Sequence, residues 1–447
     1  MLPLVGKVQH YAWGKLGSES AVARLQRDGR GVAVDEDEPY AEYWFGTHPN
    51  GPSTVKLPEG DMLLHDFLVG RPAALGVSAD SESSALPFLF KVLSVNQALS
   101  VQAHPNKALA AKLHAARPDI YKDANHKPEL ALALTPFEAL CGFRPLPDIV
   151  AGIEGCPELR DLVGDGPLAA LTSLCESAGG VSSAGSRSPA TPAAAASGAS
   201  AGSPTGSDGE LSSSAAKAAL QSAFAAFMAS AKDEGLVRDA ATALVARLRG
   251  EEAAAGSPNR ELILRLAEKY PGDIGLFAPF WLNVVTLAPG SAIFLGAGEP
   301  HAYLSGDCVE CMATSDNVVR AGLTPKLKDV PTLVSMLTYK TGVPAVLRGE
   351  ALDDCATMFA PPVPEFAVQR ITVSATRSTP YQLTEAPSAA VLLCVGGKGE
   401  AVVKDSDDER PVTLSAGSVF LETCGASVSV TASEDLLLFR VHTNAAE

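Results

Sequence analysis

The sequence predicts a mainly β protein, with two β-sandwich or barrel domains and an α-helical insertion. Residues 1–150 alternate short apolar runs with turns, which is typical of strands in a sandwich, and such runs return from about residue 276 within the second segment of this domain, 262–330. Residues 151–261 instead carry apolar side chains near helical spacing. Residues 331–447 return to short β-like runs. We therefore expect one β domain interrupted by a helical domain, followed by a second β domain.

The N-terminal region is expected to form strands in the runs PLVGKVQHYAW, YAEYWFGTH, LPFLFKVLSV and LALALTPFEALCGF. One helix is expected among them, in NKALAAKLHAAR at residues 106–117. It starts after His104-Pro105, because proline suits the first turn of a helix and Asn106 is a suitable cap.

The helical insertion is expected in the segments CPELRDLVGDGPLAALTSLCES, KAALQSAFAAFMASAKDEGLVRDAATALVARLRG and NRELILRLAEKY. Residues 177–216 between them contain Ser, Ala, Gly and Pro with almost no large apolar side chain. That composition predicts a flexible linker or loop without regular structure.

Strands are expected again from about residue 276, in LFAPFWLNVVTLAPGSAIFLGAGEPHAYLSGDCVECMAT, where Pro-Gly and Gly-rich turns separate apolar runs. From about residue 345 the runs FAVQRITV, AAVLLCVGGKGEAVVK, GSVFLE and LLLFRVHT predict the second β-sandwich. That region contains one histidine, His442, so it lacks the ligands for a metal site of the kind described next.

The bulk composition excludes several classes of partner. The chain has 35 basic and 51 acidic residues and a net charge of −16, which argues against nucleic acid or an anionic membrane surface. No apolar run approaches the roughly 20 residues of a membrane span, and the first apolar run is too short for a signal peptide. Eight scattered cysteines in 447 residues do not make a disulfide framework, which is typical of a protein in a reducing compartment. We therefore expect the protein to be located in the cytoplasm.

Four side chains have the character of metal ligands. Gln102 and His104 lie two residues apart in a β-like run, so both point to the same face. Glu129 opens another apolar run, and His301 follows the sharp turn GAGEP. Two imidazole nitrogens and two oxygens suit zinc, while manganese, iron and cobalt accept the same ligands. A single histidine is more often structural, and the coincidence of four candidates favours a metal site.

Two alternative ligand assignments are rejected. His126 lies three residues before Glu129 in an extended segment, so it faces the opposite side. Cys308 and Cys311 form a single C-x-x-C with no second pair nearby, and a spacing of three on a strand places the thiols on opposite faces.

Basic side chains gather around the same segments. Lys91 lies inside a strongly apolar strand, Lys127 lies beside Glu129, and Arg320 and Lys326 follow in SDNVVRAGLTPK. Ordinary solvated lysines are the usual interpretation of such residues. In an acidic protein, four cations near a metal site favour an anionic and phosphorylated substrate.

Five blocks of the sequence resemble the type I phosphomannose isomerases, a family of the cupin superfamily. The blocks are HYAWG (10–14), YAEYWFGTHP (40–49), LPFLFKVLSVNQALSVQAHP (86–105), YKDANHKPE (121–129) and LGAGEPHAYLSGDCVECMATSDNVVRAGLTPK (295–326). The resemblance covers nearly the whole chain in order. It implies a metal-bearing cupin domain, a helical insertion and a C-terminal jelly roll. It also implies one Zn²⁺ per chain, held by the ligand set Gln102, His104, Glu129 and His301.

The resemblance implies an isomerase that interconverts mannose 6-phosphate and fructose 6-phosphate through a cis-enediol. The family's catalytic arginine falls on Arg320, which we expect to stabilise the developing negative charge. Lys127 is expected to help proton transfer or ring opening, and Glu310 is a candidate base. The sequence does not rank Lys127, Glu310 and a metal-bound water as base. Asp316 is expected to orient Arg320.

The remaining expectations concern substrate contacts and surroundings. Lys91 and Lys326 are expected to bind the phosphate, with Ser100 as a further hydroxyl donor, and Trp13 and Tyr303 to wall the sugar site. The expected partner is a small hexose phosphate, the expected state is a monomer, and the expected role is supply for GDP-mannose synthesis and mannose catabolism.

Two functions of other classes remain as alternatives. A cupin oxygenase would use Fe(II) on two histidines and one carboxylate, although a fourth protein ligand and the basic cluster speak against it. A metal-stabilised sugar-binding cupin without catalysis predicts that Arg320→Ala keeps the metal and changes no catalytic rate.

Overall fold

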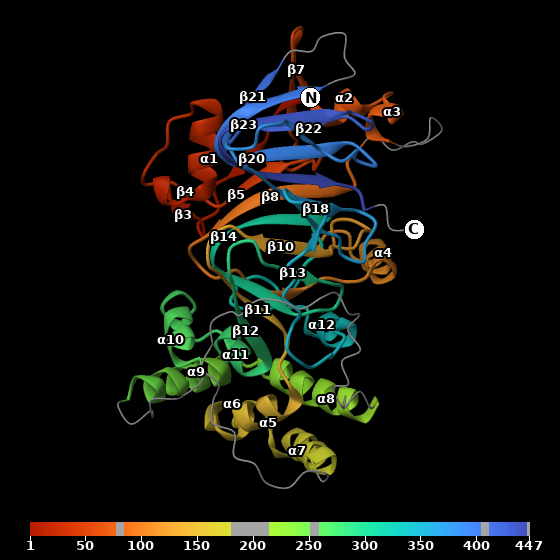
Figure 1. Cartoon of the computed structure of the whole chain (residues 1–447). Helices are drawn as coiled ribbons and strands as arrows, with labels where there is room; N and C mark the ends of the chain where they lie inside the picture. Colours follow the sequence, from red (N-terminus) through yellow and green to blue (C-terminus); the bar gives the residue numbers. More distant parts are fainter. Residues whose placement is uncertain (77–84, 180–213, 251–258, 404–410, 445–447) are drawn as a thin grey trace.

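A computed structural model of the chain describes residues 1–76, 85–179, 214–250, 259–403 and 411–444. Figure 1 shows an elongated stack of β-strands, with most of the helices at one end of it. The predicted linker at 177–216 lies outside the described residues except at its two ends.

One antiparallel sheet of ten strands carries the sequence blocks in which metal ligands are expected. Its strands are β2 (Lys7–Gln9), β5 (Glu42–Phe45), β8 (Phe88–Val95), β9 (Val101–Ala103), β10 (Glu129–Ala133), β11 (Phe137–Phe143), β12 (Leu282–Leu287), β13 (Ala292–Leu295), β14 (His301–Ala313) and β15 (Val319–Gly322). The main order is β12-β11-β14-β8-β5-β2. Off this path, β10 pairs with β13 and β14, and β9 pairs with β14 and β15. The long strand β14 is therefore the hub of this sheet.

A second antiparallel sheet of eleven strands combines the C-terminal region with three strands from the N-terminal region. Its strands are β1 (Leu2–Val5), β6 (Thr54–Leu57), β7 (Gly60–Leu63), β16 (Glu350–Ala351), β17 (Ala356–Phe359), β18 (Ala367–Val373), β19 (Tyr381–Gln382), β20 (Ala390–Val403), β21 (Val412–Ser415), β22 (Val419–Glu422) and β23 (Val428–His442). The order is β16-β17-β18-β23-β20-β22-β1-β6-β7, with β19 on β23 and β21 on β20. A separate short pair is β3 (Lys15–Leu16) with β4 (Pro39–Tyr40).

The predicted domain division placed all of residues 1–150 in the first β domain, whereas β1, β6 and β7 lie in the second sheet. Strand β1 pairs with β22 on one side and β6 on the other, and so covers an edge that β22 would otherwise expose. Such pairing between opposite ends of the chain leaves no local signal in the sequence.

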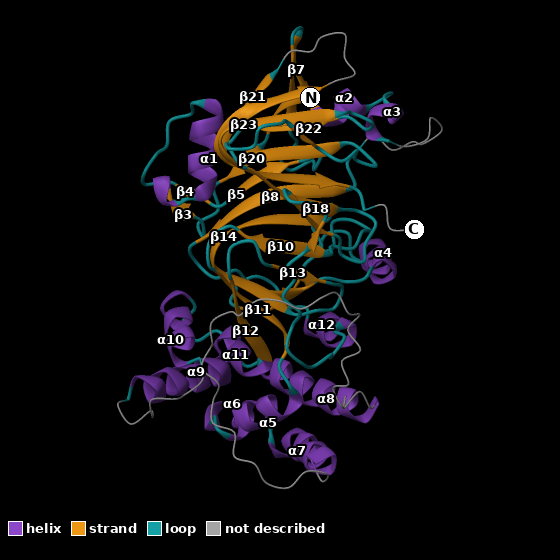
Figure 2. Ribbon diagram, in the orientation of Figure 1, coloured by secondary structure: helices purple, strands orange, loops and turns teal. Residues whose placement is uncertain are grey.

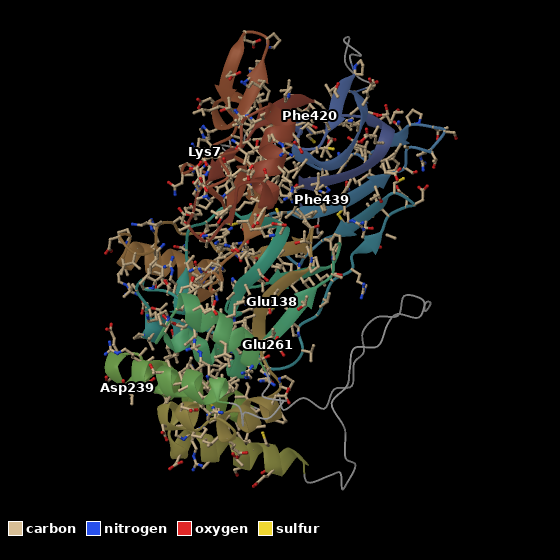
Figure 3. All side chains as sticks on the ribbon, turned by 90° about the vertical axis from the view of Figure 1, so that its left-hand side faces the viewer. Lys7, Glu138, Asp239, Glu261, Phe420 and Phe439 are labelled. Atoms are coloured by element: carbon tan, nitrogen blue, oxygen red, sulfur yellow. The ribbon has the colours of Figure 1, made fainter. Side chains whose placement is uncertain are left out.

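The two sheets share one hydrophobic core. It contains Leu4 and Phe90 from the N-terminal half, Val309 from β14, and Val391 and Phe439 from the C-terminal strands. Alternate residues of the C-terminal strands face a second core, which includes Phe420. Figure 3 labels Phe439 and Phe420 on these strands. Central strands such as β8 and β14 are buried on both faces, as their continuous apolar runs indicate.

The helices of the insertion pack against the end of the first sheet, as Figure 2 shows. They are α5 (Leu146–Glu154), α6 (Pro157–Val163), α7 (Asp165–Gly179), α8 (Ser214–Ser230), α9 (Glu234–Arg249), α10 (Arg260–Lys269), the 3₁₀ turn η2 (Ile274–Phe277) and α11 (Ala278–Trp281). In Figure 3, Asp239 marks α9 and Glu261 marks α10. The helical core includes Val101, Ala302 and Val319 from β9, β14 and β15. The helical domain therefore packs against β9, β14 and β15, the strands that carry Gln102, His301 and Arg320.

The remaining helices are short. They are η1 (Gly17–Glu19), α1 (Ala21–Arg30), α2 (Leu64–Leu68), α3 (Pro72–Leu75), α4 (Lys107–Ala116) and α12 (Val330–Met336). Among them, α12 packs against α8 of the insertion. Helix α4 confirms the helix expected after His104-Pro105, and the Asn106 side chain caps it by accepting the Leu109 N–H at 2.9 Å. Among the helices of the described ranges, none combines the length and hydropathy of a membrane span.

A buried ion pair lies inside the second sheet, between Arg440 on β23 and Glu422 on β22. Both residues are fully buried, and the guanidinium contacts both carboxylate oxygens, with one bond from Nε at 2.9 Å. Arg440 also donates to the Thr384 carbonyl at 2.6 Å and the Gln369 side chain at 3.3 Å. Each of the three guanidinium nitrogens thus donates at least one hydrogen bond to another segment.

We expect Glu422→Gln to lower the free energy of unfolding by about 3–5 kcal/mol, because it leaves the Arg440 charge buried without its counter-ion. Urea denaturation followed by circular dichroism measures the change. The matched control is Glu434→Gln, which removes the exposed pair between Glu434 and Lys398 and is expected to leave the midpoint close to that of wild type. Equal midpoints for wild type and Glu422→Gln would contradict the expectation.

Candidate metal centre

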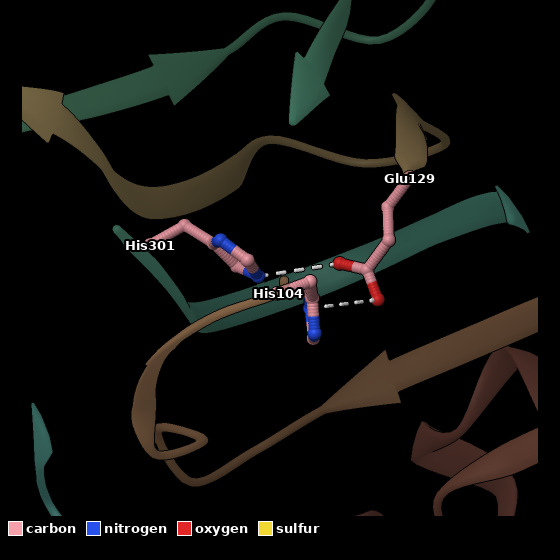
Figure 4. Close-up of side chains that lie close together, drawn as sticks. All are labelled: His104, Glu129 and His301. Carbon is pink, nitrogen blue, oxygen red and sulfur yellow. Dashed lines mark ion pairs between the residues drawn. The ribbon is translucent and has the colours of Figure 1, made fainter. Parts of the chain in front are cut away.

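Three ligand-type side chains converge at one end of the first sheet: His104, Glu129 and His301 (Figure 4). All three are buried, and their ligand atoms lie within 4.8 Å of one another. The Nε2 atom of His104 lies 3.4 Å from one Glu129 oxygen, and that of His301 lies 3.2 Å from the other. Neither Nε2 makes a hydrogen bond, so two buried nitrogens face a carboxylate with no proton-mediated contact.

The backbone around the cluster fixes which nitrogen of each ring points inward. Nδ1 of His104 lies 2.7 Å from the Asn317 carbonyl, and Nδ1 of His301 lies 2.9 Å from the Glu299 carbonyl. A carbonyl only accepts, so each Nδ1 carries the proton and donates it. The lone pairs on both Nε2 atoms therefore face Glu129, which is the arrangement of metal-ligating histidines with their outer hydrogen bonds in place. The residues present fit a divalent metal.

The charge balance of the cluster favours a metal as well. Burial lowers the pKa of His104 to about 4, so its ring is neutral at neutral pH. Burial alone would raise the pKa of Glu129, but the Lys127 ammonium outweighs it and holds that pKa well below its usual range. The Lys127 ammonium lies 2.9 Å from Glu129. A neutral imidazole and a charged carboxylate are the forms that bind zinc.

The position of Gln102, the fourth predicted ligand, follows from strand register. Its residue on β9 pairs with His301 on β14 and with Arg320 on β15. Its Oε1 accepts from the Ser100 hydroxyl at 3.4 Å. The sheet thus places Gln102 and Ser100 next to the cluster, and their roles stay predictions.

Lys91 and Glu310 lie opposite one another on β8 and β14 and form an ion pair at 2.9 Å. A second carboxylate, Glu42 on β5, lies 3.4 Å from the same ammonium, and the Trp44 ring lies 5.1 Å from it. Lys91 is buried, and burial works to lower its pKa; the Glu310 and Glu42 charges outweigh burial and raise it. The sequence assigned Lys91 to phosphate and Glu310 to proton transfer, and the structure brings the two together.

Glu310 has the character expected of a proton carrier. Burial raises the pKa of its carboxyl, Lys91 opposes the rise, and the neighbouring Glu129 charge adds to it. The hydroxyl of Tyr303 lies 3.5 Å from Glu129. Burial also raises the pKa of Tyr303 well above its usual value, so Tyr303 stays a neutral donor.

The two other predicted cations are less engaged. Arg320 is half-buried, and within the described ranges its guanidinium makes no hydrogen bond or ion pair. Lys326 is exposed. The pairing expected between Asp316 and Arg320 is not found in the described structure. Asp316 instead lies 3.2 Å from Nε2 of His48 and accepts from the Asn50 side chain at 3.0 Å. Its orienting role stays a prediction without a contact to support it.

Trp13 and Tyr303, the predicted walls of the sugar site, belong to one apolar cluster. Tyr303 is buried within that cluster, and Trp13 packs against it half-buried while its ring stacks on Tyr11. Their contact with a sugar stays a prediction.

The structure confirms the two rejections made from strand geometry. His126 turns away from the cluster and contacts Glu365 at 2.6 Å. Cys308 and Cys311 lie on opposite faces of β14, because they belong to different cores.

A second group of ligand-type residues, Asp353, Asp354 and Cys355, is explained without a metal. Asp353 accepts backbone N–H groups and the Tyr381 hydroxyl, and Asp354 pairs with Arg377.

Five residues near the site escaped the sequence analysis: Glu42, Trp44, His48, Asp123 and Asn317. Glu42 and Trp44 lie two apart on β5, so strand alternation would have placed both on one face. A buried lysine such as Lys91 also requires a carboxylate partner. His48, in a turn, had no local signal. Asp123 and Asn317 lie within two of the sequence blocks that carry the family resemblance, 121–129 and 295–326, and that was their signal.

Fold and site together define a metal-binding protein of the cupin class, in which a His–Glu–His cluster lies inside a strand-rich sandwich. The comparisons narrow this class. Residues 1–146 match the model described as phosphomannose isomerase type I, catalytic domain, and residues 197–282 match its helical insertion domain. The chain belongs to the type I phosphomannose isomerase family.

Individual relatives agree along the full length. The mannose-6-phosphate isomerase of Homo sapiens is 41% identical over 98% of both chains. A mutant phosphomannose isomerase from Salmonella typhimurium superposes with a TM-score of 0.74 at 30% identity, over 99% of both chains. The zinc-bound holo form of a mannose 6-phosphate isomerase gives 0.73 at 31% identity, again over 99% of both. The predicted fold class, cupin or jelly-roll domains with an α-helical domain, is confirmed.

Proposed function

We propose that this protein is a zinc-dependent mannose-6-phosphate isomerase that interconverts D-mannose 6-phosphate and D-fructose 6-phosphate through a cis-enediol. The observation that carries the proposal is the pair of buried Nε2 atoms of His104 and His301 facing Glu129. The 41% identity to proteins named mannose-6-phosphate isomerase supports the choice of substrate.

The zinc ligands are His104, Glu129 and His301, with Gln102 completing the set from the adjacent strand. When bound, zinc supplies a Lewis acid that polarises sugar oxygens. The carboxylate of Glu129 is already held in its charged form, and Lys127 keeps it so. One carboxylate leaves the centre with net positive charge, which suits an oxygen ligand that becomes negative during the reaction.

Proton transfer between C1 and C2 is assigned to Glu310. Its raised pKa brings the carboxyl closer to neutral pH, where it both accepts a proton from C2 of the aldose and returns it to C1. Lys91 holds the carboxylate by its 2.9 Å ion pair. Lys127 is assigned to ring opening, as the cation at 2.9 Å from Glu129.

Arg320 is assigned to the negative charge that develops on the enediolate oxygens. A guanidinium offers five N–H donors, and in the described structure none of those of Arg320 is committed to another group. Its position on β15, directly across from Gln102, places it beside the cluster.

The phosphate is assigned to Lys326 and Lys91, with Ser100 as a further hydroxyl donor. Lys326 is exposed and Lys91 is buried between two carboxylates, so Lys326 is the more accessible cation. Trp13 and Tyr303 are proposed to line the sugar ring.

The test is a coupled assay for fructose 6-phosphate formation from mannose 6-phosphate. We expect removal of zinc by a chelator to lower the rate on the order of 100-fold or more, because metal polarisation contributes several kcal/mol to the barrier. Added zinc is expected to restore it. Turnover without oxygen separates this activity from a cupin oxygenase.

The outcomes decide between separate parts of the proposal. Full activity in the chelated protein would remove the metal from the mechanism. No isomerase activity in zinc-loaded protein would remove the substrate assignment itself.

We further propose that the protein acts in the cytoplasm as a monomer and supplies mannose 6-phosphate for GDP-mannose synthesis and mannose catabolism. Eight free cysteines in the described structure support a reducing compartment. Sedimentation of the purified protein at micromolar concentration tests the monomer.

A further inference from the structure

Hydrogen bonds to one carboxylate join two of the sequence blocks that carry the family resemblance, 121–129 and 295–326. Asp123 lies in YKDANHKPE, and its Oδ1 accepts hydrogen bonds from the Asn125 N–H at 2.9 Å, the Ser315 hydroxyl at 2.8 Å and the Asn317 side chain at 3.1 Å. Its Oδ2 accepts the Asp316 N–H at 2.8 Å. Three of these donors come from the turn 315–317, which joins β14 to β15. The turn is therefore tied to the segment that precedes Glu129.

The turn 315–317 also contacts His104, one of the proposed zinc ligands. The carbonyl of Asn317 accepts the Nδ1–H of His104 at 2.7 Å. Asn317 is buried, and its side-chain amide also donates to the carbonyls of Asp123 at 2.7 Å and Asn125 at 2.9 Å. The carbonyl that orients the His104 ring is thus held in place by residues 123 and 125, while Glu129 follows a few residues later.

The same turn carries Asp316 at the edge of the site. Asp123 fixes its backbone N–H, and His48 and Asn50 hold its two carboxylate oxygens. The His48 ring accepts the Asn50 N–H on Nδ1 at 3.2 Å, so its Nε2 carries the proton that it donates to Asp316. The backbone and side chain of Asp316 are held from two different segments.

We propose that Asp123 is a positioning residue of the metal centre. It acts through the Asn317 carbonyl, which keeps the His104 ring in the tautomer and orientation that aim Nε2 at Glu129. The inference rests on the proposed function, because it concerns the zinc site of that function. It assigns a part in that function to a carboxylate that does not itself contact His104, Glu129 or His301.

The physical reason is the cost of losing an outer hydrogen bond to a ligating histidine. Groups that orient metal-bound histidines typically affect metal affinity by about 10–100-fold. In Asp123→Asn, one carboxylate oxygen becomes an NH₂ group that meets N–H or O–H donors. At least one of the four bonds then becomes a donor–donor contact, and the turn must shift.

The experiment compares wild type and Asp123→Asn in two readouts other than activity. Competition with a chromophoric chelator measures zinc affinity, which is expected to fall about 10–100-fold. The visible absorption of the cobalt(II)-substituted protein reports ligand geometry and is expected to change in position or intensity. Ser315→Ala removes one donor to Asp123 and also the hydroxyl that accepts the Asn317 N–H, so it loosens the same turn and is expected to shift both readouts in the same direction.

The control is Asp353→Asn in the C-terminal region. Asp353 also holds a turn, by accepting the N–H groups of Cys355 and Ala356 and the Tyr381 hydroxyl. It is expected to change the unfolding midpoint but neither zinc affinity nor the cobalt spectrum. Where Asp123→Asn does not fold, Ser315→Ala decides the question.

Three results have distinct meanings. Wild type that binds no zinc overturns the proposed function. Wild type that binds zinc while Asp123→Asn and Ser315→Ala bind it equally, with unchanged cobalt spectra, overturns the positioning role alone. A loss of zinc affinity in Asp353→Asn as large as that in Asp123→Asn shows a general effect of stability, and also overturns it.

Discussion

Glu129→Gln is expected to release zinc and to lower the rate of mannose 6-phosphate isomerisation by about 10³-fold or more. Glu129 is the one carboxylate between His104 and His301, and the amide removes the negative charge that offsets the metal ion. It also leaves the Lys127 ammonium, now 2.9 Å from Glu129, without its counter-ion near a cationic centre. Metal content after dialysis and the initial rate in the coupled assay measure the two effects.

The matched control is Glu138→Gln on β11 of the same sheet. Glu138 accepts from Arg265 and Ser305 rather than from the cluster. We expect it to retain zinc and to keep a rate within a few-fold of wild type. If Glu129→Gln retained one zinc per chain and its full rate, the ligand assignment would be wrong.

The sequence predicted the cluster because its members lie in short segments with simple periodicity. Lys127 was expected beside Glu129, and the structure gives them an ion pair. Strand alternation excluded His126, which contacts Glu365 instead. The final ligand, His301, lies far along the chain, and the turn before it and the family resemblance pointed to it. The register that brings it to Gln102 comes from pairing of β9 with β14.

The charged interior was not predictable in the same way. Lys91 and Glu310 lie 219 positions apart and meet only because β8 pairs with β14 in one register. Glu42 joins them through the pairing of β5 with β8. Each residue alone looks like a lone charge in an apolar strand. A buried charge needs a partner, but the sequence does not say which strand supplies it.

The architecture shows the same limit. The strands and the helical insertion could be predicted from local patterns. The assignment of β1, β6 and β7 to the second sheet, in contrast, depends on contacts between the two ends of the chain. The shared core, with Leu4 beside C-terminal residues such as Phe439, stabilises that exchange. Local periodicity therefore gave the elements, and nonlocal packing decided their neighbours.

Arg320→Ala is expected to lower kcat by about 10²–10³-fold while zinc content and the unfolding midpoint stay near those of wild type. The guanidinium is half-buried and, in the described ranges, contacts no other polar group, so its removal breaks no structural bond. A group that acts on charge developing in the transition state lowers kcat and kcat/KM together, with KM little changed. Steady-state kinetics of the zinc-loaded variant measure this.

Arg320→Lys separates charge from geometry. Lysine keeps the positive charge but loses the planar fork that reaches two oxygens at once, so we expect a rate between those of Arg320→Ala and wild type. The control for the loss of a positive charge elsewhere is Arg265→Ala. Arg265 is an exposed residue of helix α10 and pairs with Glu138 on β11. A metal-stabilised sugar-binding protein without catalysis predicts instead that Arg320→Ala keeps the metal and changes no catalytic rate. An unchanged kcat in zinc-loaded Arg320→Ala would therefore remove Arg320 from catalysis, and a loss confined to KM would move it to substrate binding.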